Sequence, residues 1–453
     1  MTQFSDLALA APLSRALAEE GHDAPTPIQA QAVPHGMKGA DVLGIAQTGT
    51  GKTAAFVLPI LHRLHEARPK MVARRPLALV LAPTRELAVQ IEERARAYGR
   101  HMRLKTALVI GGVPINRQRR QMAHGVHMLV ATPGRLADMA SQNLVDLSET
   151  EVLVLDEADQ MLDMGFIHAV KRLRALMPEE VQTYLFSATM PREIERFAAE
   201  MLTDPVRVEV TPVAKTADKV DQSVLFVPKD AKGDALRDIL VQDDVKKALV
   251  FARTKHGADK VVKGLERDGI RAAAIHGNKS QNARQRALGQ FADGKLSVLV
   301  ATDIAARGID VSDITHVIQH DLPEVPETYV HRIGRTARAG RTGVAVSLVG
   351  ADDLPLLRTI EKLTKLRVPI REGSVDPDSL GPPAPKQQGR GGRQGQRQGQ
   401  GQRQGQKAGA NRGNGQRQKP QNRSGANRGG AGSRGGQRRG RGPRGTVGTG
   451  ASA

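Results

Sequence analysis

A lysine preceded by two glycines stands near the start of the chain, in residues 46–53, which form the sequence AQTGTGKT. Gly49 and Gly51 can adopt positive φ and let backbone N–H groups approach an anion closely. Lys52 can then reach the β- and γ-phosphates of a nucleotide, and the Thr53 hydroxyl can bind Mg²⁺. A short apolar run before the loop and a helix-forming stretch after it supply the context that a phosphate-binding loop requires. The alternative is a glycine-rich loop with a solvated lysine.

A cluster of carboxylates, Asp156–Asp159 (DEAD), directly follows the apolar run VLVL. Carboxylates at the carboxyl end of a parallel strand lie where α/β sheets bind ligands. One acid there can hold Mg²⁺ through water, and the next can orient the attacking water. Acidic residues are also favoured at any helix N-terminus. The phosphate-binding loop about a hundred residues earlier favours the nucleotide interpretation over this alternative.

The elements that position these residues belong to two stretches in which apolar, strand-like runs alternate with helical patterns. Such alternation is typical of a parallel sheet covered on both faces. The stretches are residues 1–210 and 223–372, and the linker predicted between them is 211–222. The strands are expected at 41–45, 77–82, 126–131, 152–155 and 183–186, and then at 248–252, 272–275, 296–301, 315–319 and 344–349. The expected fold class is α/β, with two tandem parallel-sheet domains.

A basic tail follows the two domains. The 453 residues have a net charge of +20, and 16 of the 67 Lys and Arg lie after position 380, where there is no Asp or Glu. Residues 1–380 therefore have a net charge of only +4. Residues 373–453 lose the apolar periodicity and become rich in Gly, Gln and Arg, so we expect them to be disordered.

The composition also limits the class of protein. There is no Cys, which excludes a disulfide or a Cys-ligated metal. No apolar run approaches the roughly 18 residues of a membrane span. The first 20 residues carry Asp6 and no basic segment, which predicts a helix capped by Ser5 rather than a signal peptide. We therefore expect a soluble cytoplasmic protein that does not bind a membrane.

Ordered short motifs give the chain a resemblance to a known family. In the first domain they are Phe4, GHDAPTPIQ, AQTGTGKT, PTRELA, GG, TPGR, DEAD and SAT; in the second they are VFART, HG, QNAR, ATDIAARGID and HRIGRTARAG. Over residues 1–370 the chain resembles a DEAD-box RNA helicase. The stretch MLDMGFIH and the compact core with a basic tail are most similar to the bacterial RhlE-like group. The resemblance implies two RecA-like domains that bind ATP and RNA.

The resemblance further implies which residues bind ATP and its metal ion. Asp156 and Thr53 would hold Mg²⁺, partly through water, and Glu157 would position the attacking water, while Lys52 would contact the phosphates. The further nucleotide-binding positions would be Phe4, His22, Gln29, Thr48, Gly49, Thr50, Gly51, Gly308 and Asp310. The family usually has Phe or Tyr in place of His22, and imidazole can also stack on adenine.

Two arginines of the second domain, Arg335 and Arg338, resemble arginine fingers. A planar, permanently charged guanidinium suits the charge that spreads over a phosphoryl group in transfer. Without the resemblance, a solvated basic stretch would be the favoured explanation of both arginines. The family usually has Gly at Ala337, where a methyl group could crowd a close backbone approach. Ser187 and Thr189 would couple the ATP site to strand separation.

A third set of residues matches the family's RNA-contact positions. These are Arg85, Gly112, Thr132, Arg135, Thr254, Gln281, Arg284, Thr302 and Arg307. For any one of these arginines taken alone, a solvated surface charge is favoured over an RNA contact. As a set, the hydroxyl, Arg and backbone donors suit phosphate and sugar rather than base edges, which predicts little sequence preference and discrimination through the 2′-OH. The tail resembles RGG-type RNA-binding segments, and we expect it to add nonspecific affinity.

The leading prediction is an RNA-dependent ATPase that separates short RNA duplexes, with a monomeric core and a role in ribosome-assembly or RNA-decay complexes as family possibilities. One alternative is an ATP-gated RNA clamp or scaffold that unwinds little. Another is a DNA-directed ATPase of the wider helicase group, against which the DEAD and GHDAPTPIQ stretches argue.

Overall fold

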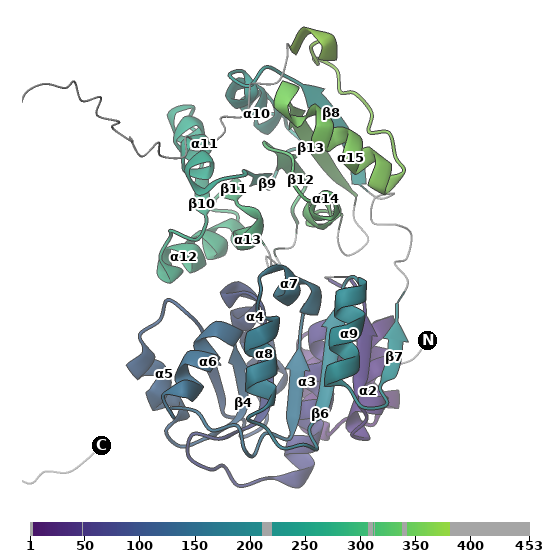
Figure 1. The fold of residues 1–453 in the computed structure, drawn as a ribbon, viewed down its shortest axis with the longest axis vertical. Helices are drawn as coiled ribbons and strands as arrows, with labels where there is room; N and C mark the ends of the chain where they lie inside the picture. The colour runs from purple at the N-terminus through teal and green to yellow at the C-terminus, as the bar shows by residue number, and fades with distance from the viewer. Residues whose placement is uncertain are drawn as a thin grey trace, which may run out of the picture. The chain divides into compact units, whose positions relative to one another are not determined.

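The described chain forms two α/β domains, and every pair of neighbouring strands in their two sheets is parallel (Figure 1). The structure is a computed structural model, and it describes residues 3–47, 49–210, 220–306, 311, 313–337 and 342–380. The expected α/β class with two tandem parallel sheets is confirmed. The predicted disordered tail lies outside the described residues from position 381 onward.

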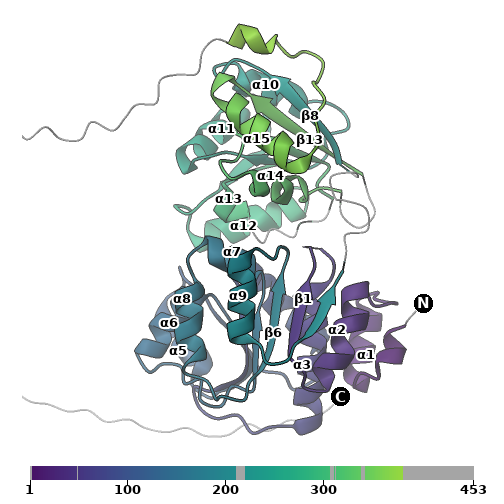
Figure 2. The ribbon, with the colours of Figure 1, turned by 45° about the vertical axis from the view of Figure 1, so that its right-hand side comes forward.

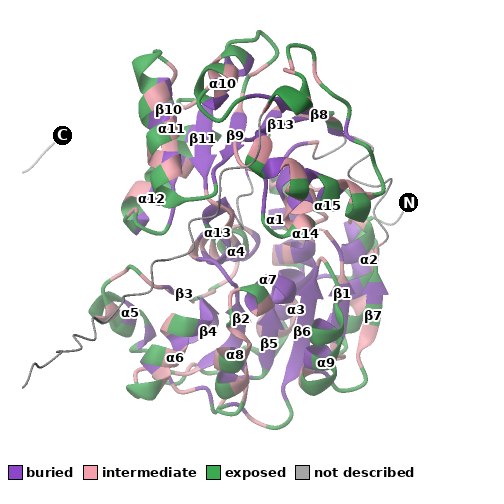
Figure 3. Cartoon of the chain, turned by 45° about the horizontal axis from the view of Figure 1, so that its top comes forward, coloured by how far each residue is buried: buried purple, intermediate pink, exposed green. Residues whose placement is uncertain are grey.

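The first sheet has the strand order β3-β4-β2-β5-β6-β1-β7. Its strands are β1 (Val42–Ile45), β2 (Pro76–Leu81), β3 (Thr106–Val109), β4 (Val126–Ala131), β5 (Val152–Leu155), β6 (Gln182–Ser187) and β7 (Val206–Glu209). The central strands β2, β5 and β6 are buried along their whole length (Figure 3). This double-sided burial explains why β2 and β5 are continuously apolar, whereas β6 also contains the polar residues Gln182, Thr183 and Ser187.

Helices cover both faces of the first sheet. They are α1 (Ala11–Glu19), α2 (Pro27–Met37), α3 (Lys52–Ala67), α4 (Arg85–Tyr98), α5 (Ile115–Met122), α6 (Pro133–Ser141), α7 (Ala158–Asp163), α8 (Ile167–Arg174) and α9 (Arg192–Met201), with the short helix η1 (Phe4–Leu7) before them. Helices α1–α4 share one apolar core with the sheet and α5–α9 share another. Figure 2 shows α1 and α2 on one side of this domain and α5, α6 and α8 on the other. Alternate residues of β2 divide between the two cores, Val80 facing the first and Leu79 the second.

The second sheet has the strand order β10-β11-β9-β12-β13-β8. Its strands are β8 (Val220–Phe226), β9 (Ala248–Phe251), β10 (Ala272–Ile275), β11 (Val298–Ala301), β12 (His316–Gln319) and β13 (Gly343–Val349). Its helices are α10 (Lys232–Leu240), α11 (Lys255–Arg267), α12 (Gln281–Ala292), α13 (Asp303–Ala306), α14 (Pro326–Ile333) and α15 (Leu354–Thr364), with the short helices η3 (Ala351–Asp353) and η4 (Pro377–Leu380). Helices α10 and α11 cover one face, and α12–α15 cover the other.

Two expected boundaries differ from the structure. Strand β8 begins at Val220, so the last three residues of the predicted linker at 211–222 belong to the second sheet. After α15 the chain returns to this strand, and the Val375 backbone N–H donates to Phe226 O at 3.0 Å. The expected tail therefore starts too early at 373, because backbone pairing with β8 continues past that point.

The N-terminal segment also differs from expectation. The prediction that Ser5 caps the first helix is wrong, because α1 begins at Ala11 and Ser5 lies inside η1. There the Asp6 carboxylate accepts a hydrogen bond from the Gln3 backbone N–H at 2.8 Å. Within the described ranges, none of the helices combines the length and apolar character needed to cross a bilayer.

Candidate functional site: motifs at the carboxyl edges of two parallel sheets

The motifs predicted to bind nucleotide and RNA in the first domain follow different halves of one sheet. The phosphate-binding loop, DEAD and SAT follow β1, β5 and β6, which are neighbours in the sheet. PTRELA, GG and TPGR follow β2, β3 and β4, which are also neighbours. Because the carboxyl ends of parallel strands meet at one edge, the topology gathers the nucleotide motifs and places the RNA motifs beside them.

The phosphate-binding loop has the backbone conformation that its glycines permit. Gly49 and Gly51 have φ values of 87° and 90°, in the left-handed region that glycine enters without strain. The Thr50 hydroxyl donates to a backbone carbonyl within the loop at 2.7 Å. Lys52 and Thr53 are the first two residues of α3, so the loop presents them at a helix N-terminus. Lys52 is 5% exposed, and its Nζ has no hydrogen-bond partner among the described residues.

The DEAD carboxylates lie at the end of β5 in a buried, strained turn. Asp156 and Glu157 are each 2% exposed. Glu157 has a φ of 55°, a conformation that costs a non-glycine residue free energy and is concentrated at functional sites. Burial raises the pKa of Asp156 to about 7, with nearby Lys52 opposing the shift and Glu157 adding to it. In the described part of the chain, Asp156 Oδ1 has no hydrogen-bond partner.

Gln29 connects the segment GHDAPTPIQ to the phosphate-binding loop. Its Oε1 accepts from the Thr26 backbone N–H at 2.9 Å, and its Nε2 donates to Gly51 O at 3.1 Å. A Cβ at Gly51 would lie only 2.3 Å from Gln29 Nε2. Gly51 is therefore required both for its positive φ and for this close approach.

The two aromatic positions predicted to help bind adenine differ in exposure, since Phe4 is buried and His22 is half-buried. Phe4 is 7% exposed and packs in the core shared by α1–α4. His22 Nε2 lies 3.4 Å from the Tyr98 hydroxyl, with the ring centroids 6.0 Å apart. Burial lowers the pKa of His22, with nearby Arg94 acting in the same direction. The neutral imidazole is therefore favoured at neutral pH.

Asp159, the last residue of DEAD, joins this motif to SAT. Its Oδ2 accepts from the Ala188 N–H at 3.2 Å and from both the N–H and the hydroxyl of Thr189 at 3.0 Å. The Ser187 hydroxyl donates to Thr189 O at 2.7 Å and completes the turn. A single buried carboxylate thus fixes the conformation of SAT and connects it directly to DEAD.

The RNA-contact positions of the first domain pack against one another. Arg85 lies beside Gly112, where a Cβ would stand 2.6 Å from its Nη1. Arg135 donates through Nη1 to Val113 O at 2.8 Å. Thr132 is buried and immediately precedes α6. Four of the predicted positions are thereby brought together at the ends of β2, β3 and β4.

The second domain repeats the arrangement at the ends of β9, β10 and β11. The Thr254 hydroxyl caps α11 by accepting from a backbone N–H at 3.0 Å, and Thr302 precedes α13. Gln281 and Arg284 lie in the first turn of α12 and are buried. Gln281 Nε2 donates to Glu86 Oε1 at 3.3 Å, and Arg284 pairs with the same carboxylate at 2.9 Å.

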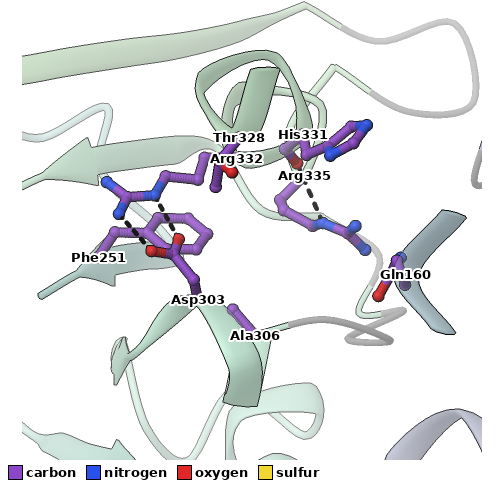
Figure 4. A pocket seen from close by; sticks show the side chains of 8 residues that line it. All are labelled: Gln160, Phe251, Asp303, Ala306, Thr328, His331, Arg332 and Arg335. Carbon is purple, nitrogen blue, oxygen red and sulfur yellow. Dashed lines mark hydrogen bonds and ion pairs between the residues drawn. The ribbon is translucent and has the colours of Figure 1, made fainter. Parts of the chain in front are cut away.

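Arg335 lies just after α14 and is 5% exposed, with its Nε donating to His331 O at 3.3 Å (Figure 4). It lines a pocket with Phe251 at the end of β9, with Asp303 and Ala306 of α13, and with Gln160 of α7. Arg332, three residues earlier, makes a bidentate pair with Asp303 at 2.6 and 2.8 Å. Its guanidinium also lies 4.9 Å from the centroid of the Phe251 ring. These contacts hold α14, and with it Arg335, against the sheet.

Five predicted site residues lie outside the described residues: Thr48, Arg307, Gly308, Asp310 and Arg338.

The structure adds three contacts that the motifs alone did not assign. Asp159 and the pair of Arg332 with Asp303 lie inside quoted motifs, so attention to every polar residue of a motif would have found them. Gln118 carries no sequence signal, yet it is 1% exposed and fixes the loop after β3 through Ile110 N (2.9 Å) and Val113 O (3.0 Å).

Comparisons with known proteins match both domains of the chain. The family profile described as "DEAD/DEAH box helicase" matches residues 26–197, and "Helicase conserved C-terminal domain" matches residues 231–340. The ATP-dependent RNA helicase CshA of Limosilactobacillus reuteri is 41% identical over 366 residues, which cover 81% of this chain and 73% of that protein. The DEAD-box ATP-dependent RNA helicase CshA of Bacillus subtilis is 41% identical over 374 residues, covering 82% and 75%.

Solved structures show the same fold. The structure of S. cerevisiae Dbp5 bound to RNA and ADP BeF3 is similar, with a TM-score of 0.72 and 29% sequence identity. The match covers 82% of this chain and 96% of that one. Both domains are therefore accounted for by known relatives.

Proposed function

The chain belongs to the DEAD-box family of ATP-dependent RNA helicases, and on that premise we propose which of its residues perform the reaction. The enzyme hydrolyses ATP in an RNA-dependent way and couples hydrolysis to local duplex unwinding. The observation that carries the assignment is the division of the first sheet into a nucleotide half and an RNA half. The ligands bound to the similar Dbp5 structure, RNA and ADP BeF3, support the same two classes of occupant here.

The buried charges fit a nucleotide with Mg²⁺. Lys52 Nζ and Asp156 Oδ1 are buried without hydrogen-bond partners among the described residues, and such groups are costly unless a ligand satisfies them. A triphosphate would satisfy Lys52, and Mg²⁺ would satisfy Asp156 together with the Thr53 hydroxyl. When bound, Mg²⁺ neutralises phosphate charge and favours the transfer.

Within this site, Glu157 orients the attacking water and accepts its proton. Arg335 and Arg338 stabilise the charge on the transferred phosphoryl group. Gln29 contacts the phosphate-binding loop through its hydrogen bond to Gly51 O. Together with Phe4 and His22, it recognises the adenine of ATP. The remaining loop residues Thr48, Gly49 and Thr50, and Gly308 and Asp310 of the second domain, complete the nucleotide contacts.

The proposed RNA-binding residues come after the strands that form the other half of each sheet. Arg85, Gly112, Thr132 and Arg135 contact the backbone from the first domain, and Thr254, Gln281, Arg284, Thr302 and Arg307 do so from the second. Ser187 and Thr189 couple the two sides, because Asp159 ties both to DEAD. Contacts to phosphate and sugar make binding nearly independent of sequence.

We propose four finer assignments, three of them from the resemblance and the cytoplasmic location from the composition. They are membership in the RhlE-like group, a monomeric core, a cytoplasmic location, and action within ribosome-assembly or RNA-decay complexes. The relatives described above are CshA proteins, so a comparison of substrate preference with a CshA protein and an RhlE protein tests the subgroup.

The experiment is strand separation of a short RNA duplex by the full-length protein, with ATP and with a non-hydrolysable analogue, while ADP is measured in parallel. Unwinding that requires ATP and releases one strand for a few ATP molecules supports the proposal. Extensive hydrolysis or stable RNA binding with no strand release would instead favour an ATP-gated clamp.

A further inference from the structure

We propose that the exposed arginines of α5 form an additional RNA-backbone contact that extends the RNA path beyond the motifs of the first domain. This inference rests on the proposed function and adds a surface to it. The three residues concerned are Arg117, Arg119 and Arg120, here called the α5 arginines. None of them belongs to the motifs through which the sequence resembles the family.

The sequence around α5 carries many positive charges and no negative ones. Between positions 94 and 137 the chain contains nine Lys and Arg and no Asp or Glu. Over residues 1–380 the net charge is only +4, so this stretch is an exception to a nearly balanced core. A surface of this kind attracts a polyanion.

The α5 arginines are free to bind a ligand. All three are exposed, and within the described residues none has a hydrogen-bond or ion-pair partner through its side chain. Some exposed arginines elsewhere in the domain have acidic partners: Arg15 pairs with Glu19 at 3.0 Å, and Arg207 with Glu209 at 3.0 Å. What distinguishes the α5 arginines is that the surrounding sequence, positions 94–137, contains no acid that could pair with them.

The position of α5 connects these arginines to the predicted RNA path. The helix begins at Ile115, three residues after Gly112. Buried Gln118 fixes it to the end of β3 through three hydrogen bonds, to Ile110 N, Ile110 O and Val113 O. Arg135, another predicted RNA contact, donates to the same Val113 carbonyl at 2.8 Å. The helix is thus attached rigidly to the loop that it would extend.

The orientation of the helix exposes the arginines to solvent. Gln118 and Met122, four residues apart, are buried against the sheet. Arg117 and Arg120, three residues apart, lie on one exposed face. Guanidinium groups bind phosphate oxygens through paired N–H donors. The occupant that this chemistry fits is the sugar-phosphate backbone of RNA that continues past Gly112.

The test is RNA affinity as a function of salt, measured by fluorescence anisotropy with a labelled 20-nucleotide RNA and the full-length protein. The variant replaces the three arginines (Arg117→Gln, Arg119→Gln, Arg120→Gln), since glutamine removes the charge and preserves helix propensity. Each lost phosphate contact lowers the slope of log affinity against log salt by about 0.7 for single-stranded RNA. The expected slope decreases by about 2, and Kd at low salt rises by roughly tenfold or more.

A matched control removes exposed arginines from a region that contains acids. Arg192→Gln with Arg196→Gln on α9, whose neighbours Glu193, Glu195 and Glu200 balance the charge, should leave the salt slope unchanged. A triple Arg→Lys variant at the α5 positions should retain most of the slope, because lysine also binds phosphate as a point charge. Thermal melting of each variant checks that the fold is intact.

The outcomes separate this inference from the proposed function. If wild type shows RNA-stimulated ATP hydrolysis but the glutamine variant keeps the wild-type Kd and salt slope, the α5 contact is refuted and the function is not. The same refutation follows if the α9 control loses as much slope as the α5 variant. Absence of RNA-stimulated hydrolysis in wild type would refute the proposed function itself. With saturating RNA, the α5 variant should hydrolyse ATP at the wild-type rate, because the α5 arginines are remote from the nucleotide motifs.

Discussion

Replacement of Asp303 by alanine should destabilise the second domain strongly. Arg332 is 2% exposed, and Asp303 supplies the carboxylate for two of its hydrogen bonds, at 2.6 and 2.8 Å. Removal of one partner from a buried ion pair costs about 3–5 kcal/mol, because the remaining charge stays buried. Arg332 keeps Gln319 Oε1 and Asp321 O as acceptors, and Asp303 is 31% exposed. We therefore expect the lower end of the range, about 3 kcal/mol.

Hydrogen–deuterium exchange of the full-length protein measures this loss directly. A decrease of about 3 kcal/mol speeds exchange of the most protected amides roughly a hundredfold. The change should appear in peptides from β11, β12 and α14, while peptides from β1 to β6 serve as an internal reference. The control is Asp352→Ala, which breaks an exposed pair with Lys229 and should cost at most about 1 kcal/mol. If Asp303→Ala accelerates exchange no more than this control, the reasoning about the buried pair is wrong.

Three further predictions concern single residues of the site. Ala337 has a φ of 55°, so Ala337→Gly should leave the second domain as stable as wild type or up to about 1 kcal/mol more stable in urea unfolding, whereas Ala235→Gly within α10 should cost about 1 kcal/mol. Gln29→Glu keeps an accepting oxygen but cannot donate to Gly51 O, so the KM for ATP should rise roughly tenfold in steady-state kinetics while the melting temperature changes little. Since burial raises the pKa of Asp156 from its ordinary value of 3.8 to about 7, its carboxyl stays protonated in the free protein below that pH. The folded protein holds this proton more tightly than the unfolded chain does, which adds to the free energy of unfolding. This contribution is fully present below about pH 4 and is lost as the pH rises toward 7. Calorimetry should accordingly show Mg²⁺–ATP affinity falling by up to about tenfold per pH unit below 7, with proton release on binding, and little change above it. Affinity that is flat from pH 5.5 to 8.5 would contradict the shifted pKa.

Much of the fold was predictable because the strands of a doubly covered parallel sheet are short apolar runs. Strands β4, β5 and β10 occur at the expected residues. Three edge strands, β3, β7 and β8, were missed, because only one side of an edge strand is paired. Their burial therefore alternates or is partial, and the sequence offers no continuous run. Strand β8 was assigned in part to the linker because its first half, VDQ, is mostly polar.

The site was predictable in type but not in its connections. Lys52, Asp156 and Glu157 follow strands whose order could not be known, and the sheet topology is what makes β1, β5 and β6 neighbours. The link from Gln29 to Gly51 spans 22 positions, and that from Asp159 to Thr189 spans 30. Such contacts depend on the tertiary fold, so motif spacing cannot reveal them.

The most direct test of the account is ATP hydrolysis by the full-length protein alone, with single-stranded RNA, and with DNA of the same sequence and length. The same measurements on Glu157→Gln test the proposed role of the carboxylate at the end of β5. We predict stimulation of wild type by RNA and not by DNA, and no turnover by Glu157→Gln although it binds ATP. Equal stimulation by DNA, or rapid hydrolysis by Glu157→Gln, would contradict the account.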